Sequence, residues 1–233
     1  MAGPVFRLHT TRYSARAGGA HRVGAMVAVG LLCLGGAATH AQLLGPLGPL
    51  DDAGEVTYFI AAGQTGSSFR SSDPQLAIWA LEAWQRAARG ALVFVRTDDE
   101  ERALVRIHWA APAGGQYGEM VGLEIGGRRG AVVFIRPDTS AFGPEIAELA
   151  AGDPLFRDTI VYLTCLHELG HALGLEHTDA FADIMYFFGL GGDITEYFAR
   201  FRRELRERSD IAKTNGLSAD DIGRLQALYD DSD

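Results

Sequence analysis

The chain has 233 residues, of which 47% are hydrophobic and 22% are charged. That length suits one substantial domain or two small ones, and the composition is typical of a packed globular protein rather than a disordered one. Two cysteines are too few for a small fold held by disulfides. The excess of 30 acidic over 21 basic residues argues against a general nucleic-acid binder.

Residues 1–41 have the features of a secretory signal peptide. They hold four arginines and no acidic residue, then an apolar run from Val23 to Ala38, then small residues before Gln42. The run is shorter than the roughly 20 residues that a membrane span needs. We therefore expect cleavage near Gln42 and a secreted, periplasmic or extracellular protein without a stable membrane span. The alternative is an uncleaved signal anchor.

The segment after the leader predicts strands and a helix. Residues 42–55 are rich in Gly, Pro and Leu and predict an extended lead-in before a strand at 56–60. Asp73-Pro74 predicts a helix N-cap followed by proline at the first helical position, and Gly90 closes that helix. Apolar residues recur inside it at helical spacing: Leu76, Ala80, Ala83, Trp84 and Ala87.

Further β-rich runs predict a sheet in the middle of the chain. They lie at 92–95, 103–109 and 131–135, and a weaker run at 119–125 has the polar alternation of a sheet edge. A second long helix is expected at 158–173. The absence of a repeat or a linker predicts one α+β domain over residues 56–233.

Two later segments predict helices. Residues 193–213 form an amphipathic pattern, with Phe198 and Phe201 on its apolar face. This helical insertion either packs on the domain with a solvated charged face or serves as a lid or partner-docking helix. Near the end of the chain, Ser218 is expected to cap a helix that turns Leu225 inward.

Residues 167–177 predict a metal site. His167 and His171 are four residues apart, so on a helix they share one face about 6 Å apart and can bind the same zinc ion. Gly174 can end the helix and let the chain return His177 to that ion. Three neutral nitrogen ligands leave one coordination position open for water, which is typical of a catalytic zinc site.

Glu168 predicts the chemistry of the site. It follows the first ligand and points off the axis of the metal, so it can reach a water without binding the ion. Zinc lowers the pKa of a bound water towards about 7, and a nearby carboxylate can take the proton and pass it to a departing amine. The prediction is hydrolysis of peptide bonds without a covalent intermediate.

The complete pattern resembles a known family. His-Glu-x-x-His-x-x-Gly-x-x-His followed by Met185 is the signature of the metzincin zinc proteases, and the spacing to Met185 is similar to that of the matrixin branch. Residues 217–229 also look like the matrixin C-terminal helix. The resemblance implies a twisted mixed sheet of about five strands on an active-site helix, C-terminal helices, and Met185 as a floor beneath the zinc.

The resemblance also implies a secreted zinc endopeptidase whose protein or peptide substrate lies extended along the edge strand at 119–125. Phe187 stands where many matrixins have proline, so a pocket preference is not carried over. Tyr186 either lines the wall of the pocket or packs behind the turn. The alternative function is a secreted zinc-binding or adhesion module of the same fold without turnover, against which Glu168 argues because a structural site does not need it.

Several other residues have simpler interpretations. Cys165 is expected to be a buried apolar residue that points away from the metal. The lead-in contains no cysteine, so we do not expect thiol-based latency. His108 is expected to be a packed core residue. Asp138 and Asp153 lie in loops where Ca²⁺ is possible, but no motif supports it. The pattern leaves the oligomeric state open.

The position of the leader gives a direct prediction. The exported protein is expected to begin at Gln42, because the small residues before it match a signal-peptidase site. N-terminal sequencing and the intact mass of the exported protein test this. Recovery of the whole leader in a membrane fraction would instead establish a signal anchor.

Overall fold

The computed structural model describes residues 48–50, 55–63, 68–109 and 117–230. The predicted signal peptide and most of the predicted lead-in lie outside these ranges. Within them, no helix is both long enough and apolar enough to cross a lipid bilayer.

Five strands form one mixed sheet with the order β2-β1-β3-β5-β4. β4 runs antiparallel to β5 at one edge, and the remaining neighbours are parallel. The strands are β1 (Val56–Ile60), β2 (Phe94–Arg96), β3 (Val105–Trp109), β4 (Gly118–Ile125) and β5 (Arg128–Ile135). The predicted α+β class, the mixed five-stranded sheet and the edge position of 119–125 are confirmed.

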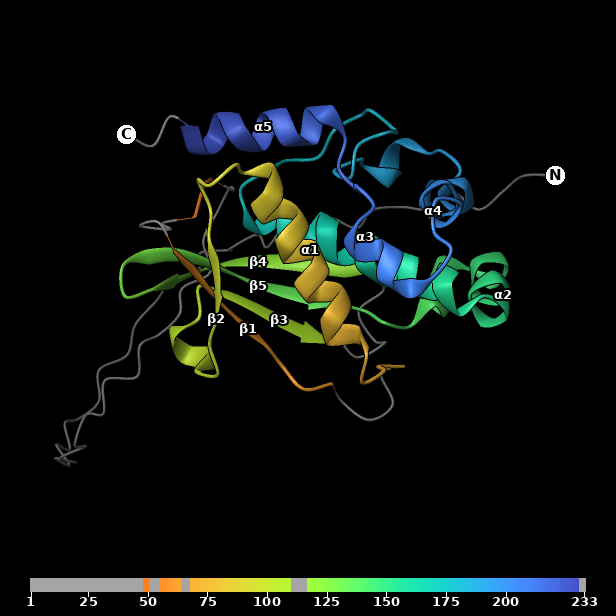
Figure 1. Cartoon of the computed structure of the whole chain (residues 1–233), viewed down its shortest axis with the longest axis horizontal. Helices are drawn as coiled ribbons and strands as arrows, with labels where there is room; N and C mark the ends of the chain where they lie inside the picture. Colours follow the sequence, from red (N-terminus) through yellow and green to blue (C-terminus); the bar gives the residue numbers. More distant parts are fainter. Residues whose placement is uncertain (1–47, 51–54, 64–67, 110–116, 231–233) are drawn as a thin grey trace, which may run out of the picture. The chain divides into compact units, whose positions relative to one another are not determined.

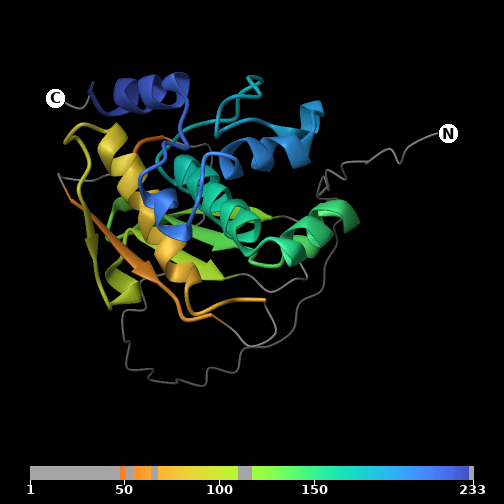
Figure 2. The same cartoon turned by 45° about the vertical axis from the view of Figure 1, so that its right-hand side comes forward.

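The described helices are α1 (Asp73–Ala87), α2 (Pro144–Gly152), α3 (Pro154–Ala172), α4 (Ile194–Arg202) and α5 (Ala219–Asp230). α1 and α3 cover one face of the sheet, while α2 and α4 pack against α3 and α5 against α1. α1 and α3 pack against each other and over the sheet, as Figures 1 and 2 show. Alternate residues of β3, namely Val105, Ile107 and Trp109, are buried beneath them, and Leu76 and Trp84 of α1 are fully buried in the same core.

Helix boundaries differ from the prediction in three places. α3 begins at Pro154 because the Asp153 carboxylate accepts from the amides of Leu155 (3.0 Å) and Phe156 (3.2 Å). α2 was not predicted. The predicted helical segment 193–213 divides into α4 and a short 3₁₀ turn at Arg208–Ala212.

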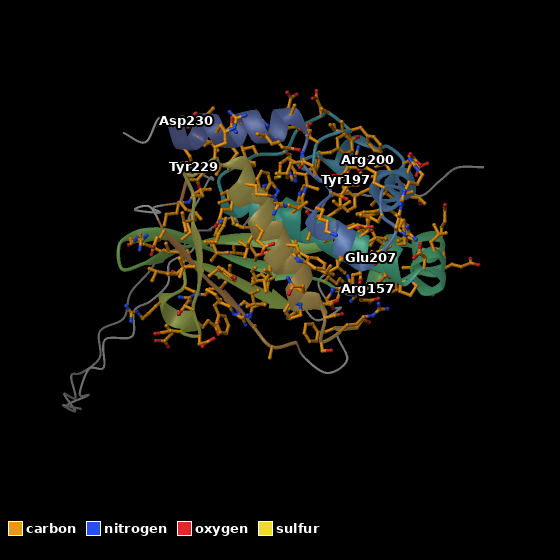
Figure 3. The ribbon with its side chains drawn as sticks, viewed as in Figure 1. Arg157, Tyr197, Arg200, Glu207, Tyr229 and Asp230 are labelled. Atoms are coloured by element: carbon orange, nitrogen blue, oxygen red, sulfur yellow. The ribbon has the colours of Figure 1, made fainter. Side chains whose placement is uncertain are left out.

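A buried ion cluster joins α1 to α3. The prediction that Asp73 is the N-cap of α1 is wrong, since Ser72 occupies that position. The Asp73 carboxylate instead binds Arg157 in a bidentate pair, with Arg157 Nη2 donating to Oδ2 at 2.8 Å. Arg157, labelled in Figure 3, is 4% exposed and also donates to the carbonyls of Ser68 (3.1 Å) and Pro137 (3.3 Å). Since a buried charge needs partners on all sides, this cluster fixes how the two helices meet.

The first described residues lie against the end of α3. The Leu50 amide donates to the hydroxyl of Tyr229 (3.0 Å), and this hydroxyl donates to the carbonyl of Leu173 (3.0 Å). Tyr229, labelled in Figure 3, belongs to α5. One side chain therefore joins the lead-in, α3 and α5.

The ion cluster predicts a large cost for removing one partner. Asp73→Ala should lower the free energy of unfolding by about 3–5 kcal/mol, because it leaves the Arg157 charge buried without its main partner. Urea denaturation measures the change. Asp98→Ala, which removes an exposed carboxylate, is the control. Equal stability of the two variants would contradict the role assigned to the cluster.

Candidate metal centre and active site

The end of α3 brings three histidines together. His167 and His171 lie one turn apart, with ring centroids 4.8 Å from each other. The helix stops at Gly174, whose φ of +101° suits glycine, and the Leu175 amide donates back to the Gly170 carbonyl at 2.9 Å. This turn returns the chain so that the ring of His177 lies 4.5 Å from that of His171.

The imidazole nitrogens converge on one point. Nε2 of His177 lies 3.2 Å from Nε2 of His167 and 3.1 Å from Nε2 of His171. Nδ1 of His167 faces the carbonyl of Ile184 (2.7 Å), and Nδ1 of His171 faces the carbonyl of Leu175 (2.8 Å). A carbonyl only accepts, so we assign the ring proton of both residues to Nδ1. Their Nε2 lone pairs are then free to bind a cation at the centre of the cluster.

Burial keeps these rings neutral in the metal-free protein. It lowers the pKa of His167 to about 3 and that of His171 to about 4, and it also lowers the pKa of His177. Metal ions bind neutral imidazole, so protons compete little near neutral pH. The three histidines could therefore hold a metal ion.

Glu168 lies beside the cluster, between α3 and the edge strand. It is 7% exposed, and burial, with a smaller contribution from Glu119, raises its pKa to about 8. Gly118 of β4 packs directly on it, because a Cβ at that glycine would collide with the Glu168 side chain. A carboxyl group with a raised pKa next to such a histidine cluster is suited to move protons.

A cavity of about 470 Å³ opens at this point. The three histidines and Glu168 form part of its wall, and the rest comes from Tyr117 and the edge strand, from Phe142 before α2, from α3 and from the segments after Met185. These further lining residues are Tyr117, Gly118, Glu119, Met120, Phe142, Leu163, Thr164, Tyr186, Phe187, Phe188, Gly189, Tyr197 and Phe198. The cavity is thus largely aromatic and apolar away from the histidines.

Met185 and Tyr186, the residues of the predicted Met-turn, have different surroundings: Met185 packs on α3, and Tyr186 lines the cavity. Met185 is fully buried, and its sulfur packs so closely on Gly170 of α3 that a Cβ there would collide with it. Tyr186 lines the cavity and is also packed, being 6% exposed and donating from its hydroxyl to the Gly191 carbonyl at 3.0 Å. Tyr186 is thus a packed residue that also lines the cavity, and its role in a substrate pocket stays a prediction.

α4 and α5 support Ile184, whose carbonyl faces Nδ1 of His167. The Ile184 amide donates to the buried carboxylate of Asp221 (2.8 Å), and the Tyr197 hydroxyl shares its one proton between the carbonyls of Asp183 (2.9 Å) and Ile184 (3.2 Å). Ser218 caps α5 as predicted, since its hydroxyl accepts from the Asp221 amide at 2.9 Å. Sequence reasoning missed the support from Tyr197 and Asp221, although the Ser-x-x-Asp spacing indicates a capping box.

α4 contributes to the wall of the cavity. Tyr197 and Phe198 are buried and line it. The guanidinium of Arg200 lies 4.2 Å from the centre of the Tyr197 ring, and the two residues are labelled side by side in Figure 3. The predicted insertion therefore shapes the site, whichever of its two predicted roles it has.

The remaining candidates lie away from the metal cluster. Cys165 is buried, as predicted. The prediction that His108 is a packed core residue is wrong: its position in β3 places it on the sheet face opposite the helices, where Nε2 lies 3.1 Å from Glu100. Asp138 accepts from the Ser140 amide (3.0 Å), and Asp153 caps α3, so both carboxylates have protein partners.

The raised pKa of Glu168 predicts a stability profile for the metal-free protein. The folded state keeps the proton up to about pH 8 while the unfolded chain loses it near 4.5, so stability falls as the pH rises through that range. Glu168→Gln removes this loss and should be more stable than the native protein at pH 9 by at least about 1 kcal/mol, but not at pH 4. Urea denaturation with a chelator tests this, and identical pH profiles would contradict it.

The chain matches no protein-family model, and no curated protein is significantly similar to it. Its site is consequently defined by its own residues and geometry. These are three converging imidazoles, a buried carboxyl group and an apolar cavity beside an edge strand.

Proposed function

We propose that the protein is a zinc-dependent endopeptidase of the metzincin clan, matrixin-like. The observation that carries the proposal is the convergence of three Nε2 atoms beside buried Glu168, in a cavity bordered by the sheet's edge strand. The order of the sheet, with an antiparallel strand at the edge next to α3, supports the same clan.

Zinc fits the donor set. Two nitrogens that each lie 2.0–2.1 Å from a tetrahedral ion are about 3.4 Å apart, and the observed separations of 3.1 and 3.2 Å are close to this. His167, His171 and His177 would hold the ion and leave a position open. A zinc ion bound there supplies Lewis acidity, which acidifies a water and polarises a substrate carbonyl.

Glu168 supplies the proton transfers. As a carboxylate, the form that a cation held by the histidines would favour, it takes a proton from the attacking water, and as the acid it delivers that proton to the amine nitrogen that departs. Its position against Gly118 holds the side chain at the mouth of the cavity, between the metal ligands and the strand that borders the substrate. Met185 packs behind α3 and gives the ligand helix a rigid, apolar support.

The substrate proposed is a protein or peptide in an extended conformation. Within the described residues, β4 pairs only with β5, so its other edge has free backbone groups to pair with a substrate strand. The aromatic cavity next to the histidines suits one apolar substrate side chain. The predicted signal peptide would deliver this activity outside the cytoplasm.

The proposal predicts the behaviour of one substitution. The purified protein should bind one zinc ion and cleave members of a mixed peptide library. Glu168→Ala should keep the zinc but lose at least about 100-fold in kcat/KM, because the proton acceptor is gone while the ligands remain. Mass spectrometry of the digests and metal analysis measure both properties.

The controls separate the alternatives. Glu148→Ala removes an exposed carboxylate on α2 and should cleave like the native protein. A chelated sample should lose activity and regain it with zinc. Stoichiometric zinc without cleavage would favour the binding or adhesion module, and no zinc binding would overturn the proposal.

A further inference from the structure

One exposed carboxylate of the edge strand, that of Glu119, lies next to the cavity. β4 passes the site at Gly118, Glu119 and Met120, all three of which line the cavity. Glu119 is exposed and, in the part of the chain that the structure describes, its carboxylate makes no hydrogen bond or ion pair. Its carboxylate is therefore free to meet a cation of a bound molecule.

The register of the sheet fixes the side to which Glu119 points. Gly118 pairs with Ile135, which is buried in the core under the helices, whereas Glu119 pairs with Phe134, which is only half-buried. Successive side chains of a strand alternate between the two faces. Glu119 therefore points to the outer face of the sheet, while Met120 points to the face that carries the helices.

The same alternation applies to a peptide that pairs with β4. Every second side chain of the peptide lies on the outer face, and those between them point towards α3 and the aromatic cavity. Neighbouring side chains on one face of paired strands have Cβ atoms about 4.5–5.5 Å apart. A lysine or arginine in the peptide can thus reach the Glu119 carboxylate across the pair.

The charge around the cavity favours such a cation. Apart from the histidines, Glu119 and Glu168 are the charged residues among those that line it, and no lysine or arginine is among them. Glu119 and Glu168 line the same cavity, and Gly118, the residue before Glu119, packs directly on the Glu168 side chain. The Glu119 carboxylate attracts a positive charge in a substrate and repels a negative one.

We propose that Glu119 is a specificity residue, which selects peptides that carry Lys or Arg next in sequence to the residue whose side chain enters the cavity. The inference rests on the proposed function, because it seats the substrate strand on β4. Glu119 contacts the substrate's positive charge and not the reacting atoms. The selectivity arises from strand register, so it applies to alternate positions of the peptide.

Peptide binding tests the proposal without depending on turnover. A series of extended peptides, blocked at both ends, carries one phenylalanine for the cavity and Lys, Gln or Glu at each flanking position in turn. Fluorescence anisotropy gives their Kd for the zinc-supplemented Glu168→Gln protein. At alternate positions, Lys should bind about three- to fivefold more tightly than Gln, as expected for an exposed ion pair.

Substitution on the same strand provides the matched control. In the Glu168→Gln protein, a second substitution Glu119→Gln should bring the ratio of the affinities for the Lys and Gln peptides to about one. The second substitution Glu124→Gln, which removes another exposed carboxylate of β4, should leave this ratio unchanged. The preference should also shrink in about 0.5 M salt. An equal Lys preference at every position, its survival in Glu119→Gln, or no measurable binding of any peptide would overturn the proposal.

Parallel cleavage assays separate this inference from the function on which it rests. They use the protein with Glu168 intact and the same peptides. A Glu119-dependent Lys preference in binding, with no peptide cleaved, would refute the endopeptidase and leave the cation site standing. Cleavage with no dependence on charge would refute the role of Glu119 and leave the endopeptidase standing.

Discussion

The close approach of three imidazole nitrogens is the constraint on which the rest of the site depends. The Nε2 atom of His177 lies 3.1–3.2 Å from the Nε2 atoms of the other two histidines, and the lone pairs on these atoms repel each other unless a cation lies between them. The rings therefore need support from other residues to stay in place. That support comes from the carbonyls of Ile184 and Leu175, which fix the Nδ1 protons. The Leu175 carbonyl is positioned by the end of the helix at Gly174. The Ile184 carbonyl is positioned by the side chains of Asp221 and Tyr197, which contact Ile184.

This arrangement costs stability in the absence of metal. Burying Glu168 with a raised pKa and holding histidines neutral both disfavour the charged forms that water would stabilise. The core under α1 and α3, together with the Asp73–Arg157 cluster, keeps the scaffold folded around these groups. The protein therefore concentrates its least favourable side chains at the place where the proposed chemistry needs them.

Sequence patterns predicted the parts of the fold that depend on short-range order. The i, i+4 spacing of His167 and His171 and the helix stop at Gly174 required only local geometry, and both appear in the structure. His108 was misassigned because an alternating strand pattern does not say which face is covered. The support of Ile184 by Asp221 joins residues 37 positions apart, and only tertiary packing creates it. Glu119 likewise gained meaning only once the strand register was known.

The hydrogen bonds of Tyr229 have a consequence for the order in which the protein folds. They join Leu50 to a residue 179 positions later and reach the carbonyl of Leu173, directly before the turn that leads to His177. Until α5 is in place, Leu173 lacks its Tyr229 contact and Ile184 lacks Asp221. Contacts between such distant residues carry a large loop-closure cost and slow folding. The supports of the histidine cluster are therefore complete only once α5 has packed against the rest of the domain.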